Sequence, residues 1–418
     1  MLNSTPKSER LTIAFFGKRN AGKSSLLNAV TNQEIAVVSD IAGTTTDPVT
    51  KAMELLPLGP VTVIDTPGFD DSGALGEKRV QKTREILEKT DIAVLVVAAD
   101  DSGVKEPAGK AGADTAAANT AAGEAEANKE LIKLLKERKI PYIIAYTKAD
   151  LLSETPPKKK DNEIFVSSLS GENINELKEM LGALAPKEKS IRLVGDFIKK
   201  GDTVVLVTPI DESAPKARLI LPQQQAIRDI LDARAVSVVV QPSELEKTLS
   251  SFKEPPALVI CDSQVFKAVA KIVPPEIPLC SFSILFACYK GLLKAALPGA
   301  MALDKLKDGD TLLISEGCTH HRQCNDIGTK KLPAWISEYT KKDLNFEFTS
   351  GGGFPQEEEL KDYALIVHCG GCMLTDKEIL YRQEKASSAG VPITNYGLVI
   401  AKMNGILERA TEIIMKLC

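Results

Sequence analysis

Two short segments toward the C-terminus hold all three histidines of this 418-residue chain, and in both segments the histidines lie beside cysteines. The first segment begins at Gly317 and the second at His368. Thiolate and imidazole groups placed in this way usually bind a soft metal ion or an iron–sulfur cluster. We therefore predict a metal centre there, and its candidate ligands are Cys318, His320, His368, Cys369 and Cys372.

The residues alone leave zinc, an iron–sulfur cluster and a metal-free thiol site all open. Three cysteines and one histidine form a common structural zinc site, but such a site needs four fixed ligands. Three cysteines leave one ligand position open, and more donors are available than that position needs: His320, His321, Cys324 and His368. A cluster on three thiolates with an exchangeable fourth ligand tolerates that surplus. Partners at ligand spacing are missing for three further cysteines, which we predict to lie in the core: Cys261, Cys280 and Cys288.

A phosphate-binding loop lies near the N-terminus. The segment from Gly17 to Ser24 reads Gly-Lys-Arg-Asn-Ala-Gly-Lys-Ser, which matches the Walker A pattern. In that pattern the glycines turn backbone N–H groups toward the β-phosphate, Lys23 reaches the β- and γ-phosphate oxygens, and the Ser24 hydroxyl binds Mg²⁺. A helix expected to begin near Lys23 directs its positive end at the same phosphates. The loop therefore predicts binding of a nucleoside triphosphate with Mg²⁺.

Later segments follow this loop in the order of a GTPase. Asp65 ends an expected strand and can hold Mg²⁺ through water, and the Gly68 amide can sense the γ-phosphate. Thr45, in a polar loop before them, is predicted to give Mg²⁺ a second hydroxyl. Asp150 can accept both guanine N–H donors while Lys148 packs on the base. The predicted nucleotide-binding residues are Gly17, Asn20, Gly22, Lys23, Ser24, Ser25, Thr44, Thr45, Asp65, Gly68, Thr147, Lys148, Asp150, Ser167 and Ser168.

Together these segments resemble those of the translation-factor-like GTPases, near Era and the tRNA-modification GTPase MnmE. Thr147 replaces the usual asparagine of that class and Ser168 the usual alanine, so GTP is favoured over ATP with weaker guanine selectivity. Phe69 stands where a glutamine usually orients water. The resemblance implies slow, potassium-stimulated hydrolysis with a potassium site at Asn20. The residues expected to act in hydrolysis are Lys23, Thr45, Gly68 and Glu77, although Glu77 suits a helix N-terminal acid equally well.

The elements that must position both sites alternate between strand and helix patterns, which predicts an α/β protein. We expect a P-loop GTPase domain over residues 1–186, followed by two α/β domains with mainly parallel sheets: a dimerisation domain over 191–270 and an iron–sulfur cluster-binding domain over 271–418. The Ala- and Gly-rich stretch at about 107–127 is expected to be a flexible surface insertion, because it buries little apolar surface. A long helix is expected over 399–416. Strands ending before Cys318 and at His368 would bring their cysteines together at one sheet edge.

Bulk composition is that of a soluble globular protein, with 44% hydrophobic and 26% charged residues and a formal net charge of −4. No apolar run reaches the roughly 20 residues of a membrane span. The polar N-terminus lacks a signal-peptide core, so a cytoplasmic location is expected. In a reducing cytosol, the eight cysteines favour metal binding or free thiols over disulfides. No basic stripe for nucleic acid is present.

The spacing of Cys318-x-His320 and His368-Cys369-x-x-Cys372 is similar to the cluster signature of the HydF family, the GTPases of [FeFe]-hydrogenase maturation. The similarity covers nearly the whole chain and includes residues 40–48, 219–223, 326–328 and 394–397. It implies a homodimer of three-domain subunits with a [4Fe–4S] cluster. Such a protein would act as scaffold or carrier for a diiron precursor, which it receives from two radical-SAM maturases and delivers to apo-[FeFe]-hydrogenase. GTP hydrolysis would gate these encounters.

Two other functions are compatible with part of these signals. A ribosome- or tRNA-directed GTPase with a structural zinc site would explain the P-loop and the cysteines, but the chain offers little basic charge and no aromatic platform for RNA. An iron–sulfur redox enzyme is the second alternative. It is weakened because the sequence carries neither a second cofactor fingerprint nor the Cys-x3-Cys-x2-Cys motif of radical-SAM enzymes.

Overall fold

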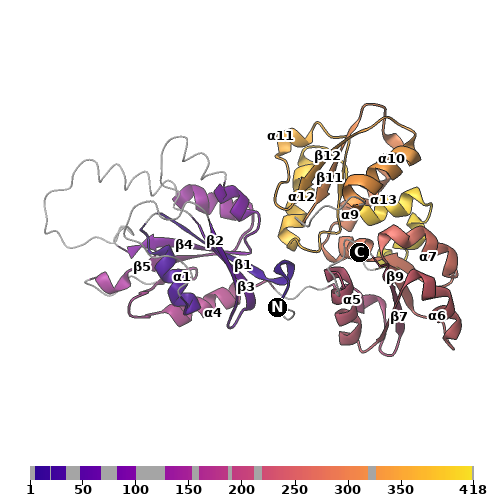
Figure 1. The fold of residues 1–418 in the computed structure, drawn as a ribbon. Coiled ribbons are helices and arrows are strands. Elements are labelled where there is room, and N and C mark those ends of the chain that lie inside the picture. The colour runs from indigo at the N-terminus through magenta and orange to yellow at the C-terminus, as the bar shows by residue number, and fades with distance from the viewer. Residues whose placement is uncertain are drawn as a thin grey trace. The chain divides into compact units, whose positions relative to one another are not determined.

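A computed structural model describes residues 5–18, 20–33, 48–66, 82–99, 128–152, 160–186, 191–210, 219–318 and 326–416. The chain divides into two compact units, Met1–Glu188 and Lys189–Cys418 (Figure 1). The expected insertion at 107–127 lies outside the described residues.

The N-terminal unit is built on a six-stranded sheet with the order β2-β3-β1-β4-β5-β6. Its strands are β1 (Leu11–Gly17), β2 (Val49–Leu55), β3 (Gly59–Asp65), β4 (Ile92–Ala98), β5 (Tyr142–Thr147) and β6 (Glu163–Phe165). Strand β2 runs antiparallel to β3, and the remaining pairs are parallel. Its helices are α1 (Lys23–Thr31), α4 (Ile174–Leu184) and the helical stretches 82–87 and 128–137.

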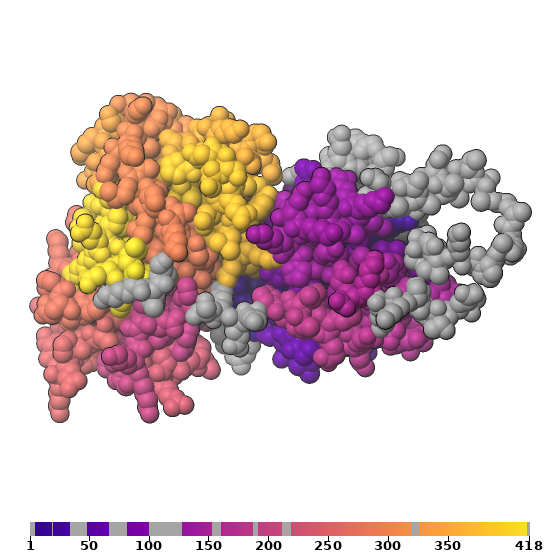
Figure 2. All heavy atoms as spheres, turned by 180° about the vertical axis from the view of Figure 1, so that it is seen from behind, coloured from indigo at the N-terminus to yellow at the C-terminus, as the bar shows by residue number. Residues whose placement is uncertain are grey.

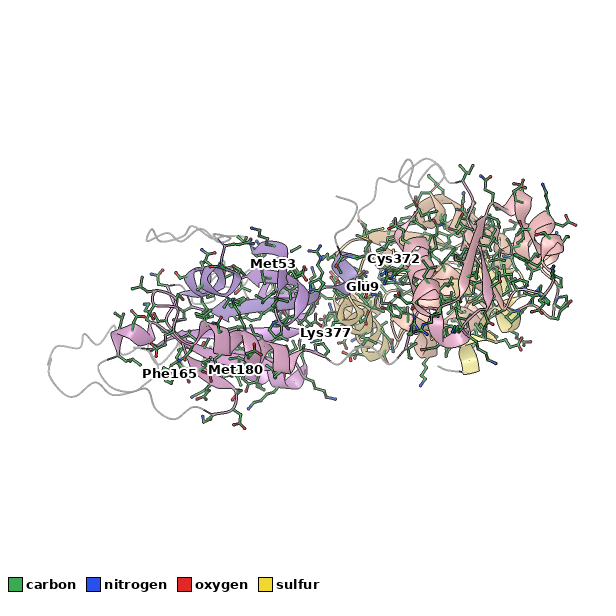
Figure 3. The ribbon with its side chains drawn as sticks, turned by 90° about the horizontal axis from the view of Figure 1, so that it is seen from below. Glu9, Met53, Phe165, Met180, Cys372 and Lys377 are labelled. Atoms are coloured by element: carbon green, nitrogen blue, oxygen red, sulfur yellow. The ribbon has the colours of Figure 1, made fainter. Side chains whose placement is uncertain are left out.

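The alternation of side chains along β1 explains how helices cover both faces of this sheet. Ile13 and Phe15 join a buried cluster with residues of α1 and α4, whereas Ala14 and Phe16 join a second cluster with the stretches 82–87 and 128–137. All four β1 side chains are fully buried, as expected of a central strand in a doubly covered parallel sheet. Met53 of β2 and Met180 of α4, both labelled in Figure 3, pack against the first cluster.

The C-terminal unit contains two four-stranded sheets whose strand pairs are all parallel, with the orders β10-β9-β7-β8 and β12-β11-β13-β14. The strands are β7 (Thr203–Val207), β8 (Val236–Val240), β9 (Leu258–Cys261), β10 (Leu279–Ser281), β11 (Thr311–Glu316), β12 (Asn345–Ser350), β13 (Leu365–His368) and β14 (Ile393–Asn395). The expected α/β class, a P-loop GTPase sheet followed by two parallel-sheet regions, is therefore confirmed.

Helices of the C-terminal unit lie between and around these strands. They are α5 (Leu221–Asp232), α6 (Leu245–Ser251), α7 (Phe266–Ile272), α8 (Phe282–Tyr289), α9 (Leu293–Met301), α10 (Leu332–Thr340), α11 (Glu357–Leu360), α12 (Asp376–Ser388), α13 (Tyr396–Met403) and α14 (Leu407–Thr411). Figure 1 shows α11 and α12 on one side of the β11–β14 sheet and α10 and α13 on the other.

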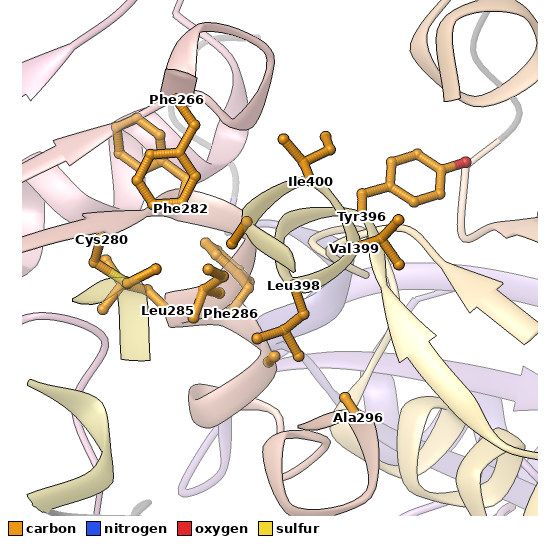
Figure 4. Close-up of a cluster of buried hydrophobic side chains, with 14 of the residues drawn as sticks. Phe266, Cys280, Phe282, Leu285, Phe286, Ala296, Tyr396, Leu398, Val399 and Ile400 are labelled. Carbon is orange, nitrogen blue, oxygen red and sulfur yellow. The ribbon is translucent and has the colours of Figure 1, made fainter. Parts of the chain in front are cut away.

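One continuous hydrophobic core joins the two sheets of this unit. Figure 4 shows its centre, where Phe282 and Phe286 of α8 lie near Leu398 and Ile400 of α13. In the space-filling view, the orange and yellow atoms of the last region lie directly against the salmon atoms of the middle region (Figure 2). Because the core runs through both regions, the C-terminal unit should unfold as a single body.

Two elements differ from the expected pattern. Strand β10, which was not predicted, pairs with β9 and extends the middle sheet to Ser281. The helix expected over 399–416 is interrupted after α13, because Gly405 adopts a φ of 69°, a left-handed conformation that ends a helix. The chain resumes helical structure in α14 and in the 3-10 turn Ile414–Lys416.

Candidate nucleotide site and metal centre

The P-loop follows β1 and leads into α1 at the carboxyl edge of the first sheet. The Lys23 ammonium is buried and lies inside the loop, donating to the Gly17 carbonyl at 2.9 Å and to the Lys18 carbonyl. Gly22 has a φ of 86°, and a Cβ there would lie 3.2 Å from Thr147 Oγ1. A glycine is therefore required at this bend both by its backbone conformation and by its close approach to β5.

Ser24 and Asp65, the residues predicted to bind Mg²⁺, are in direct contact. Ser24 Oγ donates to Asp65 Oδ2 at 2.7 Å, while the other carboxylate oxygen, Oδ1, is buried and has no hydrogen-bond partner among the described residues. Burial raises the pKa of Asp65, although the Ser24 hydroxyl and the Lys23 charge act against that rise. An unsatisfied buried carboxylate oxygen beside a hydroxyl is a fitting site for a divalent cation, which takes oxygen ligands.

The base-recognition segments lie at the ends of β5 and β6. Thr147 is 1% exposed, and its hydroxyl donates to the Ala21 carbonyl at 2.6 Å. This threonine therefore ties β5 to the P-loop although it replaces the usual asparagine. Ser167 Oγ donates to Asp150 Oδ1 at 2.5 Å, which fixes the carboxylate predicted to read guanine. Lys148, two residues before Asp150, adopts a φ of 59°.

The structure describes only some of the residues predicted for this site. Ser25 lies half-buried in α1, Ser168 is half-buried, and Asn20 is exposed with a φ of 58°. Five predicted residues lie outside the described part of the chain: Thr44, Thr45, Gly68, Glu77 and the cluster candidate His320.

Two adjacent strands carry the cysteines of the predicted metal centre to one edge of the last sheet. Strands β11 and β13 are parallel neighbours, and their register places Ser315 beside His368. The chain continues from β11 into Cys318 and from β13 into Cys369. The Gly317 N–H donates to Cys369 Sγ at 3.1 Å, so the two segments are in direct contact. Residues distant in the sequence therefore meet at this edge.

The thiols at this edge lie in a buried environment that disfavours the thiolate form when no cation is bound. Burial raises the pKa of Cys369 to about 11 and that of Cys372 to about 12, and the nearby Cys318 thiol contributes to both shifts. Cys369 Sγ accepts a second N–H from Gly371 at 3.4 Å. Since these thiols are protonated at neutral pH when no cation is near, a bound metal would be needed to keep them as thiolates.

A single zinc ion would hold its thiolate ligands at about 2.3 Å. Within the described ranges, no three Cys, His, Asp or Glu side chains are placed to hold one metal ion in common. The three thiols at the β11–β13 edge nevertheless remain close enough to influence each other's pKa values. Thiols from two neighbouring strand ends could hold zinc or an iron–sulfur cluster, since both take thiolate ligands.

His368 has its ring nitrogens engaged inside the protein. The side chain is completely buried, with Nδ1 2.7 Å from the Cys369 carbonyl oxygen and Nε2 2.9 Å from Arg382 Nη1. Burial, together with the Arg382 charge, lowers the pKa of His368 to about 3. In this arrangement both ring nitrogens have hydrogen-bond partners within the protein. A role for His368 as a cluster ligand stays a prediction.

Sequence reasoning missed two buried cations next to this centre. Arg382 of α12 is 5% exposed and contacts His368. Lys290, after α8, is 2% exposed; its Nζ donates to the Leu374 carbonyl at 3.1 Å and lies 2.9 Å from an Asp376 carboxylate oxygen. Its charge acts against the rise that burial causes in the pKa of Cys372, which is labelled in Figure 3. One signal for Arg382 was available, because it shares a helical face with the buried Ile379 and Ala386.

Three further cysteines of the described residues lie in the core. Cys261, Cys280 and Cys288 are buried in the C-terminal unit, as predicted. Cys288 departs from the expectation of reduced cysteines, because it is disulfide-bonded.

The sheet order, the P-loop and the Ser24–Asp65 pair define a P-loop GTPase of the Era and MnmE class. Residues 12–148 match the family described as 50S ribosome-binding GTPase. Residues 193–291 match the hydrogen maturase F dimerization domain, and residues 294–413 match the hydrogen maturase F tetramerization domain. Taken together, these matches show that the chain belongs to the hydrogen maturase F family, HydF.

Relatives outside that family share only part of the chain. The tRNA modification GTPase MnmE of Nitrosomonas europaea is 28% identical over 197 residues, covering 46% of this chain and 38% of that protein. MnmE of Xanthomonas oryzae pv. oryzae is 34% identical over 188 residues, covering 45% of this chain and 36% of that protein. The chain thus spans little more than a third of the length of these curated relatives.

Solved structures give a partial likeness. Era of Aquifex aeolicus bound to GDP and AlF4⁻ aligns with a TM-score of 0.34 at 19% identity, covering 55% of this chain and 92% of that one. The G domain of the T. maritima FeoB iron transporter aligns with a TM-score of 0.29 at 21% identity, covering 43% of this chain and 100% of that one.

None of the described helices has the length and apolarity needed to span a membrane.

Proposed function

We propose that this hydrogenase maturase GTPase is a scaffold that binds a [4Fe–4S] cluster through Cys318, Cys369 and Cys372. The contact between Gly317 N–H and Cys369 Sγ is the observation that carries this proposal. It joins the segments after β11 and β13, so thiols from both can act on one metal centre. The family membership supplies the context, which is maturation of [FeFe]-hydrogenase.

When bound, the cluster would supply an iron whose fourth ligand can be exchanged for a cargo metal unit. The chain's own groups prepare the site for that cargo. Backbone N–H groups of Gly317 and Gly371 donate to Cys369 Sγ, and the buried Lys290 charge favours the thiolate form of Cys372. Because His368 is engaged by Arg382, we assign the fourth position to His320 or to an exchangeable ligand.

The cargo in this proposal is the diiron precursor of the hydrogenase active site. We propose that the protein receives it from radical-SAM maturases and delivers it to apo-[FeFe]-hydrogenase. The dimerization and tetramerization matches support an oligomer, for which we propose a homodimer as the basic assembly. GTP and Mg²⁺ would order the loops that carry Thr45 and Gly68, and hydrolysis would release them.

Metal analysis tests this function directly. Anaerobically purified protein should be brown, contain about four iron and four sulfide per subunit, and give the EPR signal of a reduced [4Fe–4S] cluster. The measurement is iron and sulfide quantification with EPR on the wild type and on His320→Ala. A colourless protein with one zinc per subunit would overturn the proposal, and it would favour a ribosome- or tRNA-directed GTPase with a structural zinc site.

We further propose that potassium stimulates GTP hydrolysis through Asn20. This residue is exposed in the P-loop, and its φ of 58° is a backbone conformation that asparagine tolerates. Hydrolysis should be faster in potassium than in sodium at equal ionic strength, measured by phosphate release. Asn20→Gly keeps the backbone conformation accessible while removing the side-chain oxygen, so it should abolish the difference. Equal rates for the wild type in both salts would contradict the role of Asn20.

A further inference from the structure

We propose that Arg382 is a positioning residue of the metal centre, which holds His368 in one tautomer and keeps its imidazole from becoming a cluster ligand. This inference rests on the proposed function, because it concerns the same cluster. It adds a residue from α12, outside both cysteine segments, to the machinery of the site.

The guanidinium of Arg382 connects the ends of three neighbouring strands. Nη1 lies 2.9 Å from His368 Nε2, at the end of β13, and donates to Ser315 Oγ of β11 at 3.3 Å. Nη2 donates to the Gly351 carbonyl, which directly follows β12. The guanidinium also lies over the Phe354 ring, 5.1 Å from its centroid. A planar group with several fixed donors is suited to this task, and lysine lacks that geometry.

These contacts determine where the His368 proton sits. A guanidinium can only donate, so Nε2 of His368 must accept from Arg382. The partner of Nδ1, 2.7 Å away, is the Cys369 carbonyl oxygen, which can only accept. Nδ1 therefore carries the ring proton and donates it to that carbonyl. Arg382 thus acts through His368 on the backbone of the residue that supplies a thiolate.

The chain of contacts extends to the neighbouring strand. Thr349 Oγ1 donates to Ser315 Oγ at 3.1 Å, so the hydroxyl that accepts from Arg382 is itself held by β12. Ser315 is completely buried and directly precedes Glu316-Gly317-Cys318. Arg382 therefore supports both backbone segments that lead into the cysteines. Groups that orient metal ligands in this way typically change metal affinity about 10- to 100-fold when they are removed.

The test uses full-length protein with its cluster reconstituted anaerobically. Reduced clusters are compared by HYSCORE after ¹⁵N-histidine labelling, and cluster release to a chelator is timed. In Arg382→Met, His368 loses its donor, so a new histidine-nitrogen coupling should appear and cluster release should be about 10-fold faster. That coupling should disappear in the double variant Arg382→Met/His368→Asn. Arg382→Lys should show an intermediate release rate.

Two controls separate positioning from a general loss of structure. Lys385→Met removes another buried cation of α12, one that contacts Gln356 instead of His368, and should leave the coupling and release rate unchanged. His368→Asn alone should leave the histidine coupling of the wild type unchanged. This second variant keeps Arg382 and so remains informative if Arg382→Met does not fold.

The outcomes distinguish this inference from the proposed function. If His368→Asn removes a histidine coupling that the wild type shows, His368 is a ligand and the role of Arg382 is wrong. If Arg382→Met folds with unchanged coupling and release rate, the inference is also overturned. If the wild type binds no [4Fe–4S] cluster at all, the proposed function itself has failed.

Discussion

Lys23→Ala is expected to abolish GTP hydrolysis while leaving the metal content unchanged. The Lys23 ammonium lies inside the P-loop, 2.9 Å from the Gly17 carbonyl, where the β- and γ-phosphates of a nucleotide would be bound. Its loss removes a positive charge from the developing negative charge of the transition state. Removing one such stabilising group typically lowers the rate about 100- to 1,000-fold. Phosphate release at saturating GTP measures the effect.

Lys133→Ala is the matched control for this substitution. Lys133 belongs to the same unit but is exposed, and it forms an ion pair with Glu137 along its helix. Such a surface pair contributes little to stability, so this variant should hydrolyse GTP at the wild-type rate. Lys23→Ala hydrolysing GTP at more than a tenth of the wild-type rate would contradict the assignment of the nucleotide site.

The fold class followed from local patterns because each central strand is a short apolar run bounded by helix-breaking residues. The runs ending at Gly17 and at Asp65 were recognisable for that reason. Both are strands of the first sheet, and these two residues are their carboxyl ends. Strand β10 was missed because it consists of only three residues and begins within a run of buried side chains that continues into α8. Its strand character comes from pairing with β9.

The meeting of the two cysteine segments was predictable from the sequence, but the contacts of His368 were not. Adjacent parallel strands that each lead into a cysteine must bring those cysteines to one edge, and the structure places them there. Whether a neighbouring histidine faces the metal depends on side-chain packing from another element. Here Arg382 of α12 engages the ring, and the spacing of His368 to Cys369 carries no information about that contact.

Buried cations were missed because a charged residue in a sequence is normally assigned to the surface. Arg382 occupies a core-facing position of α12, and Lys290 follows the apolar helix α8. Both side chains are nevertheless at most 5% exposed. A buried charge is costly unless it is paired or hydrogen-bonded. The carbonyl, carboxylate and imidazole partners that offset this cost come from distant parts of the chain, so they can be identified only in the folded structure.

Cys369→Ala is expected to produce the reverse of Lys23→Ala: loss of the cluster with GTP hydrolysis retained. Cys369 is the thiol that links the two cysteine segments, since its sulfur accepts N–H groups from both Gly317 and Gly371. Without it, two thiolates remain for a cluster that we propose requires three. Iron should fall from about four per subunit to near zero, with loss of the reduced EPR signal. Hydrolysis should persist because the nucleotide site belongs to the other compact unit, with cores of its own.

Cys280→Ala separates loss of a ligand from loss of a buried thiol. Cys280 is completely buried in the same unit, and burial raises its pKa so that it stays a protonated core residue. Its replacement should cost some stability through the small cavity it leaves, but it should not change the iron content. If Cys369→Ala retained a full [4Fe–4S] cluster, the three-thiolate assignment would be wrong. If Cys369→Ala and Lys23→Ala each lost both hydrolysis and iron, the two sites would not be separable, and a scaffold with an independent nucleotide switch could not describe this protein.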